Sequence, residues 1–162
     1  MKALLADLLI GLMTCAAPLE AMGEELGRLQ ALMSCLEEPA PTPVLQSLSS
    51  AGLLGERSGP GDDDDYCWPL ATPLDWSGAT FTSLCVVTDN SEAMASHPEF
   101  YWEGALAPWT EVWLISAAPA DHLKAWATRT LPPASRFEID RLQGEYSHSA
   151  LSCSEWHFPL PG

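Results

Sequence analysis

Residues 80–88 read TFTSLCVVT and residues 110–116 read TEVWLIS, and these two stretches decide the fold. Both are rich in β-branched and aromatic residues, which favour β-strands, and the turn-forming pair Asp89-Asn90 ends the first. The sequence therefore predicts a strand at each place. Residues 99–106 are a further candidate strand and lie close enough to residues 110–116 to pair with them in a hairpin.

The chain between and after these strands predicts one helix and one more strand. Pro119 suits the first position of a helix, and Asp121 lies near the positive end of its dipole. We predict a helix over residues 119–131. Residues 136–142 have apolar positions at period two, at Phe137 and Ile139, which is typical of a strand, but the stretch could equally form a helical turn. These elements predict an α+β fold: a small, mostly antiparallel sheet with one covering helix.

The first 38 residues carry a long apolar stripe with helical spacing. The positions that form it are Leu5, Leu8, Leu12, Cys15, Leu19, Met22, Leu26, Leu29, Met33 and Leu36. Pro18 interrupts the run and Pro39 stops it, because proline lacks the backbone donor that a helix interior needs. We therefore expect an amphipathic helical hairpin or a kinked helix over residues 1–38. The stripe from Leu5 to Leu36 is also a candidate seam for self-association.

Residues 39–65 are rich in Pro, Ser and Gly and end in the acidic run Asp62 to Asp65. This composition is typical of a linker, in which we expect one short helical turn between Val44 and Leu54. Consecutive carboxylates point apart, whereas metal-binding loops alternate acids with other residues so that the ligands converge. We therefore predict no metal site there. The chain divides into a helical segment (1–38), an acidic linker (39–65) and a tryptophan-rich α+β domain (66–162).

The charge of the chain is strongly negative, with 22 acidic against 7 basic residues and a net formal charge of −15. Nucleic-acid binding depends on Lys and Arg that neutralise phosphates, so this balance argues against it. No Lys or Arg occurs between Ser58 and His122. We expect a basic partner to supply the missing cations.

The amino terminus has the outline of an export signal. Lys2 precedes an apolar run that ends at Thr14-Cys15, a pattern seen in secreted proteins and lipoproteins. Asp7 inside the run, Thr14 before the cysteine and the continuous helical stripe argue against this interpretation. We predict a cytoplasmic protein without a membrane span, and the alternative is an exported protein whose residues 1 to about 21 are a signal segment.

The five cysteines form no CxxC pair, which excludes a zinc ribbon or a thioredoxin-like motif. In the cytosol they would be buried thiols, and their odd number favours this interpretation slightly. If the chain were cleaved ahead of Cys35, four would remain, and two disulfides with three alternative connectivities would become available.

No cofactor or catalytic signature is present, and the nucleotide-binding motifs GxGxxG and GxxxxGK[ST] are both missing. His148, Cys153 and His157 have a loosely metal-like spacing, but no second pair of cysteines accompanies them, and zinc normally has four protein ligands in a structural site or three in a catalytic one. A catalytic role for Cys153 with either histidine as base would require an orientation that spacing does not supply. We therefore predict a non-enzymatic protein with no cofactor, no metal and no catalytic residue.

The aromatic residues all lie between Tyr66 and Phe158, and seven of them are tryptophans, which often anchor protein interfaces. Several lie beside acids. The predicted partner-binding residues are Trp102, Glu103, Trp109, Glu111, Trp113 and Asp121, with Glu99 as a further acid that steers association.

This physical profile of a small, acidic, tryptophan-rich α+β chain resembles that of bacterial immunity proteins. The resemblance implies that the protein occludes a basic toxin or effector, with acids that steer association and aromatics that anchor it. A dimeric secretion chaperone for an exported effector is one alternative, since such chaperones are also small, acidic and α+β. An exported lipoprotein or periplasmic factor is another.

Overall fold

The computed structural model of the chain describes residues 19–57, 66–101, 109–141 and 148–158. Within these residues, five strands form a single antiparallel sheet in the order β1-β2-β3-β5-β4. The strands are β1 (Tyr66–Trp76), β2 (Ala79–Val87), β3 (Glu111–Ser116), β4 (Glu138–Arg141) and β5 (Ser149–Ser154). The predicted α+β class with its antiparallel sheet is confirmed.

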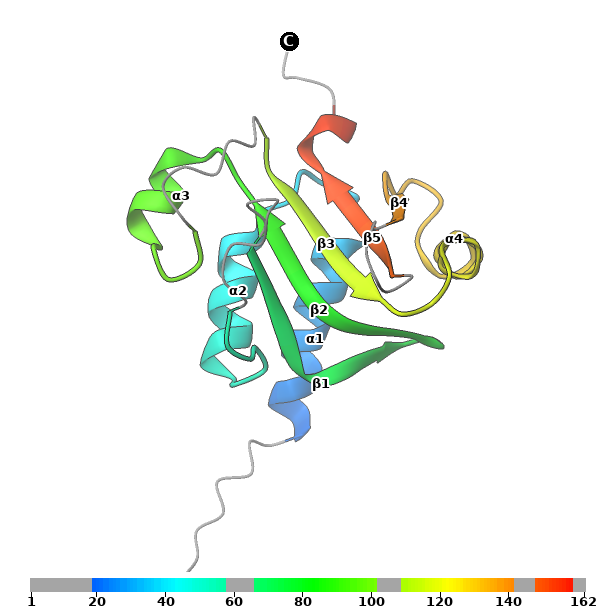
Figure 1. Cartoon of the computed structure of the whole chain (residues 1–162), viewed down its shortest axis with the longest axis horizontal. Coiled ribbons are helices and arrows are strands. Elements are labelled where there is room, and N and C mark those ends of the chain that lie inside the picture. The colour runs from blue at the N-terminus through cyan, green and yellow to red at the C-terminus, as the bar shows by residue number, and fades with distance from the viewer. Residues whose placement is uncertain (1–18, 58–65, 102–108, 142–147, 159–162) are drawn as a thin grey trace, which may run out of the picture.

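Helices α1 and α2 lie together behind the sheet, and α4 lies at the edge that β4 and β5 form (Figure 1). The opposite face of the sheet, turned toward the viewer in Figure 1, carries no labelled helix. The helices are α1 (Leu19–Met33), α2 (Pro41–Ser50), α3 (Ser91–Ser96), α4 (Ala120–Thr130) and the 3-10 helix η1 (Glu155–His157). The sheet therefore has one face that the helical layer covers and one face on which side chains can form a surface.

Four predicted elements are present in the structure. The stretches 80–88 and 110–116 form β2 and β3, and the stretch 119–131 forms α4. The stretch 136–142 forms the strand β4, so the alternative of a helical turn is wrong for its described residues. These elements were predictable because β-branched runs, turn pairs and prolines are local signals.

The predicted strand at residues 99–106 is wrong for residues 99–101, which form a turn, and residues 102–108 lie outside the described residues. The backbone N–H groups of Phe100 and Tyr101 both donate to the carbonyl of His97, which holds this turn. Both aromatic rings are buried, and the Tyr101 hydroxyl lies 2.7 Å from Thr42 Oγ1. The strand β3 pairs with β2 and β5 instead of forming the expected hairpin.

One hydrophobic core joins the helical layer to the sheet. Leu29 and Met33 of α1 and Leu45 and Leu48 of α2 are fully buried in the same cluster as the inward-facing strand residues. The stretch 41–50, which we expected to lie in a linker with one short helical turn, is thus a ten-residue helix packed on the core. Its two prolines, Pro41 and Pro43, are tolerated because they lie in the first turn, where the backbone needs no donor.

Helix α1 ends at Met33, before the proline that was expected to stop it. Cys35 has a φ of +52°, a left-handed conformation that often ends a helix. The N–H groups of Ser34 and Cys35 donate to the carbonyls of Ala31 and Leu32. The predicted kink near Pro18 lies outside the described residues.

The strand β1 lies at one edge of the sheet, which explains how it tolerates Pro69 and Pro73. Part of this edge pairs with the chain that follows α2: the N–H of Gly55 donates to Pro69 O, and the N–H of Ala71 donates to Leu53 O. A Cβ atom at Gly55 would lie 2.9 Å from Pro69 Cγ, so only glycine allows this approach.

Candidate functional site: an acidic tryptophan patch

The alternation of β3 sends its side chains to two different environments. Val112 and Leu114 face the core, while Glu111, Trp113 and Ile115 are half-buried on the other face. Glu111 lies at the start of the strand and Ile115 near its end. The pattern creates a row of large side chains on the sheet face that the helical layer leaves uncovered.

The strand register extends this row across the sheet. Trp113 is paired with Cys85 of β2 on one side and Ser152 of β5 on the other, and Ser152 is in turn paired with Glu138 of β4. Residues paired across antiparallel strands share a face. Asp140 lies two residues beyond Glu138 on the same strand, so its side chain belongs to this face as well.

Trp109 and Trp156 contact each other beside the first residue of β3. Their ring centroids lie 5.3 Å apart in an edge-to-face arrangement. The indole N–H of Trp109 donates a 3.0 Å hydrogen bond to Glu111 Oε2, which fixes the orientation of the ring. Trp156 is 67% exposed, the highest exposure of any large apolar side chain among the described residues. An exposed tryptophan held by a partly buried one is a preorganised contact surface.

The 3-10 helix η1 is tied to the start of β3 by two reciprocal hydrogen bonds, one between backbone groups and one to a side chain. The N–H of Glu155 donates to Thr110 O at 2.9 Å, and the N–H of Thr110 donates to Glu155 Oε2 at 3.0 Å. The side chain of Ser154 accepts a hydrogen bond from the N–H of Trp156 and caps the helix. These bonds hold the backbone of Glu155 and Trp156 beside the start of β3.

Three carboxylates gather on the same face of the sheet. Burial raises the pKa of Asp140, and the nearby charges of Glu111 and Glu138 raise it further. Hydrogen bonds from Ser152 and Trp113 act in the opposite direction but do not restore the ordinary value. A carboxylate whose pKa is raised in this way is a site of unfavourable negative charge at neutral pH.

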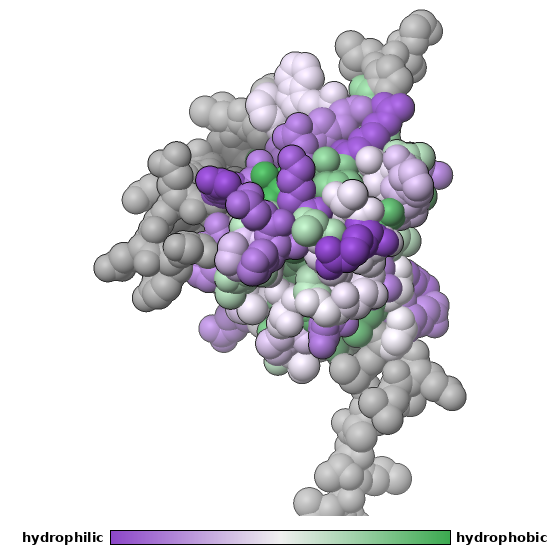
Figure 2. Space-filling view, turned by 90° about the vertical axis from the view of Figure 1, so that its right-hand side faces the viewer, coloured by the Kyte–Doolittle hydropathy of each residue, from purple (hydrophilic) through white to green (hydrophobic). Residues whose placement is uncertain are grey.

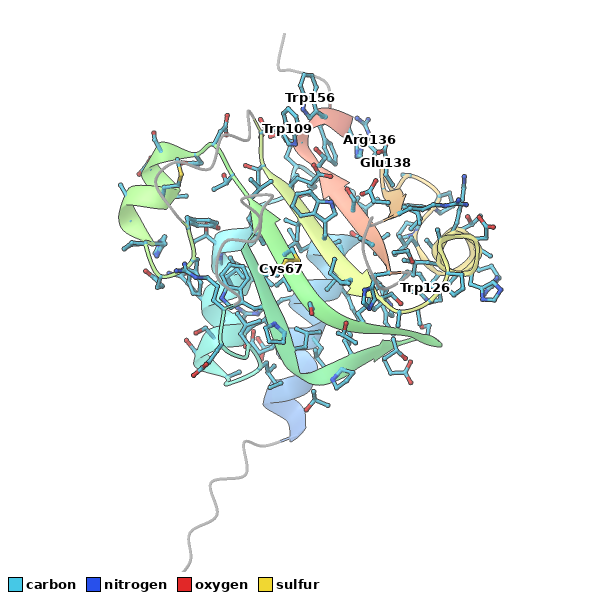
Figure 3. All side chains as sticks on the ribbon, viewed as in Figure 1. Cys67, Trp109, Trp126, Arg136, Glu138 and Trp156 are labelled. Carbon is cyan, nitrogen blue, oxygen red and sulfur yellow. A yellow bond between two sulfur atoms is a disulfide. The ribbon has the colours of Figure 1, made fainter. Side chains whose placement is uncertain are left out.

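We call this surface the acidic tryptophan patch. Its members are Trp109, Glu111, Trp113, Glu138, Asp140, Glu155 and Trp156. Figure 3 shows Trp109, Trp156, Arg136 and Glu138 at the same end of the molecule.

Basic groups compensate the patch only in part. His157 Nε2 lies 3.2 Å from Glu138 Oε1. Arg136 donates to the carbonyl of His157 and lies over the Phe158 ring. Glu111 and Asp140 accept hydrogen bonds from neutral donors, and within the described part of the chain neither has an ion pair with a basic side chain. The patch therefore keeps uncompensated negative charge beside an exposed aromatic ring.

The predicted partner-binding residues fall in three places. Trp109, Glu111 and Trp113 lie together in the patch. Asp121 is in the first turn of α4 at the opposite end of β3, where it lies 3.3 Å from Arg141. Trp102 and Glu103 lie outside the described residues. Glu99 is exposed and lies 3.2 Å from His97 in the turn after α3.

The sequence did not predict Trp156, Glu155, Glu138 and Asp140 as members of the site. Glu155 and Trp156 are adjacent in the sequence, which is a signal of the same aromatic and acidic kind as at Trp109. Glu138 and Asp140 carry no local signal, because only the pairing of β4 with β5 and of β5 with β3 brings them to this face.

The residues considered for a metal site do not converge. Cys153 is fully buried on the core face of β5, while His157 contacts Glu138 at the acidic tryptophan patch. Within the described residues there is no group of three or more metal-ligating side chains close enough to hold an ion.

The prediction that the cysteines are buried thiols is wrong for two of the four described cysteines. Cys67 and Cys85 are joined by a disulfide between β1 and β2, where they are direct register partners with Cα atoms 4.0 Å apart. Cys35 and Cys153 are buried free thiols. The odd number of cysteines was misleading because pairing depends on strand register, which spacing does not reveal. Cys15 lies outside the described residues.

The apolar stripe of the amino-terminal segment faces the protein's own core where it is described. Leu29 and Met33 are fully buried and Leu26 packs against the same cluster, while Leu36 is 49% exposed. The buried positions are therefore not accessible to a second copy of the folded chain. No helix in the described ranges is long and apolar enough to cross a bilayer.

The side of the molecule that carries α4 and β4 is largely hydrophilic, with apolar residues in small separate areas (Figure 2). Comparison with known proteins identified no relative: no family model, no curated protein and no solved structure matches the chain.

Proposed function

We propose that the protein is a non-enzymatic binding protein whose acidic tryptophan patch docks a basic protein partner. The observation that carries this proposal is the combination of an exposed Trp156 with the carboxylates of Glu111 and Asp140, which have no basic counterpart among the described residues. A partner that brings Lys or Arg to this end of the sheet would supply the missing cations.

The two kinds of side chain in the patch have separate roles in this proposal. The carboxylates attract a basic surface over a distance and raise the rate of association. Trp109 and Trp156 supply large, rigid apolar area that loses water on contact, which is typical of residues that dominate binding energy. An Arg or Lys stem packed on an indole face would gain cation–π attraction as well.

Occlusion of a toxin or effector is the specific activity that we favour. The physical profile resembles that of immunity proteins, and the patch needs no chemistry of its own to block a partner's active surface. The small, rigid surface of the patch is suited to a preorganised complex, because its tryptophans are already held by hydrogen bonds and backbone contacts.

The test begins with capture of partners on the full chain from its native host at low salt. The captured protein is then purified, and its affinity is measured against variants. We expect Trp156→Ala to weaken binding by about tenfold or more. Leu36→Ala removes the other exposed large apolar side chain and is the matched control, which should bind normally.

Charge is tested in the same way. Glu111→Gln keeps an acceptor for Trp109 but removes the charge, and it should weaken binding, whereas Asp121→Asn at the other end of β3 should have little effect. If the purified partner is acidic, or if both patch variants bind as tightly as the unmodified chain, the proposal is wrong.

Export is a second proposal, and it is compatible with the first. The Cys67–Cys85 disulfide favours it, because disulfides persist in secreted and periplasmic proteins and are rare in the cytosol. The amino-terminal run before Cys15 then has the role of a signal segment. Mass spectrometry of the mature protein tests this: cleavage before Cys15 or nearby supports export, and an intact Met1 or Ala3 start contradicts it.

A further inference from the structure

Two buried thiols lie where the helical layer meets the sheet. Cys35 follows the end of α1 in a left-handed conformation, and Cys153 is on the core face of β5 opposite Val112. Both side chains are 0% exposed and belong to the same core. The carbonyl of Cys35 also accepts a 3.0 Å hydrogen bond from the N–H of Arg136, which holds this point of the chain in place.

The Cys35 thiol lies against the strand that carries Cys153. It is 3.7 Å from the carbonyl oxygen of Ser152, the residue before Cys153, and both thiols are fully buried in the same core. The neighbouring Cys153 thiol, together with burial, raises the pKa of Cys35 far above its ordinary value. The native thiol is therefore protonated at neutral pH and unreactive, since the thiolate is the nucleophile in disulfide exchange.

Because Cys67 and Cys85 are bonded to each other, Cys35 and Cys153 can form a disulfide only with each other among the described cysteines. With Cys67 joined to Cys85, a single connectivity remains among the four cysteines from Cys35 onward. Cys35 and Cys153 are far apart in sequence, and a bond between them would close a long loop in the unfolded chain. Closing such a loop stabilises the native state by restricting the unfolded one.

We propose that Cys35 and Cys153 are a second disulfide site, which oxidises while the chain folds in the presence of a disulfide oxidant. One thiol loses its proton and attacks the oxidant's sulfur–sulfur bond, which forms a mixed disulfide and releases one thiol of the oxidant. The second cysteine then displaces the other half, also as a thiol. Two protons and two electrons pass from the pair to the oxidant, which becomes two thiols.

The site would fasten the end of α1 to β5 one residue from Ser152, whose hydroxyl contacts Glu111 in the acidic tryptophan patch. The bond would thus hold the helical layer on the sheet directly behind the patch. This inference does not depend on the proposed function, because the pair lies in the core and makes no use of a partner.

The test uses the full chain with Cys15→Ser, so that four cysteines remain. The reduced, unfolded protein is refolded with a mixture of reduced and oxidised glutathione, denatured, alkylated and digested for mass spectrometry. We expect one peptide pair linked through Cys35 and Cys153 and another linked through Cys67 and Cys85, with almost complete loss of alkylation at all four. Alkylated Cys35 and Cys153 beside an intact Cys67–Cys85 bond would overturn the proposal.

Two further measurements keep the test decisive. Native protein that was folded under reducing conditions should form the Cys35–Cys153 bond at least tenfold more slowly than refolding protein, because burial and protonation protect the thiols. A variant with Cys67→Ala and Cys85→Ala should still form the bond during refolding. Circular dichroism shows whether that variant is folded. If it is folded, and Cys35 and Cys153 form a disulfide neither with each other nor with glutathione, the site is not oxidisable and the inference fails.

Discussion

The hydroxyl of Ser152 on β5 lies 2.5 Å from the Glu111 carboxylate on β3, to which it donates a hydrogen bond. The same hydroxyl is near enough to Asp140 on β4 to lower the pKa of that carboxyl. A serine has a single hydroxyl proton, so it can donate to only one carboxylate at a time. Because the hydroxyl proton is donated to Glu111, the effect of Ser152 on Asp140 is outweighed by burial and by the charges of Glu111 and Glu138, which raise the pKa of Asp140.

Neutralising Asp140 should stabilise the protein at neutral pH. A carboxyl whose folded pKa is raised above the unfolded value of 3.8 contributes stability when protonated, and that contribution is lost as the pH rises through the folded pKa. We therefore expect Asp140→Asn to have a higher free energy of unfolding than the unmodified chain at pH 7. The difference should disappear below pH 3.8, where both forms are neutral. Urea denaturation at several pH values measures it.

The exposed Asp121→Asn is the control for this effect, because its side chain is 87% exposed and makes only a surface ion pair. Its stability should differ little from that of the unmodified chain at any pH. Lower stability of Asp140→Asn at pH 7 would show that the hydrogen bonds from Ser152 and Trp113 outweigh the cost of the charge.

Removing the shared hydroxyl should destabilise the protein. Ser152 is fully buried, so Ser152→Ala leaves a carboxylate without its donor, at a cost of about 1–3 kcal/mol in the free energy of unfolding. Ser135 is a matched control, since its buried hydroxyl oxygen has no hydrogen-bond partner among the described residues. Ser135→Ala should be neutral or slightly stabilising. Equal effects of the two substitutions in urea denaturation would contradict this account of Ser152.

The sequence was sufficient to predict the elements that local signals define. The runs 80–88 and 110–116 form strands on account of β-branched residues, and prolines mark the limits of the helix predicted at 119–131. Residues 41–50 form a full helix where only a short helical turn within a linker was predicted, because a Pro- and Ser-rich composition suggests a linker. Their helix is stabilised by tertiary burial of Leu45 and Leu48, which no local pattern reports.

The site was predictable in part for the same reason. Trp109, Glu111 and Trp113 lie in β3 or just before it, at every second position. The alternation of side chains along a strand is therefore sufficient to place them on one surface. Trp156 and Asp140 join them through the pairing of β5 with β3 and β4, and this order was not evident from the sequence. Likewise, the partnership of Cys67 with Cys85 follows from the register of β1 on β2.

Two glycine substitutions should have opposite effects on stability. Gly27 is exposed in α1, and a Cβ there would meet no atom within 4 Å, so Gly27→Ala should stabilise the protein by about 1 kcal/mol through helix propensity. Gly55→Ala should destabilise it by roughly 1–3 kcal/mol, because the new Cβ would lie 3.1 Å from the backbone oxygen of Pro69. Urea midpoints measure both. A stable Gly55→Ala protein would show that residues 53–55 can leave the edge of β1 at little cost.

The proposed division of roles within the patch predicts different kinetic effects once the partner is known. Glu111→Gln should lower the association rate constant several-fold at low salt, because it removes a charge that steers the encounter. Raising the ionic strength from about 0.01 to 0.15 M shortens the Debye length from about 30 to 8 Å. At the higher ionic strength, Glu111→Gln and the unmodified chain should therefore associate with the partner at similar rates. Trp156→Ala removes contact area without changing charge, and we expect it to raise the dissociation rate constant at every salt concentration.

Stopped-flow mixing of the purified partner with each variant measures these rates, and Asp121→Asn serves as the charge-matched control from the opposite end of β3. If Asp121→Asn slows association as much as Glu111→Gln does, the attraction comes from the net charge of the whole chain and the patch has no special part in steering. If Trp156→Ala changes association and leaves dissociation unaltered, Trp156 contributes to the encounter and is not a buried anchor of the complex.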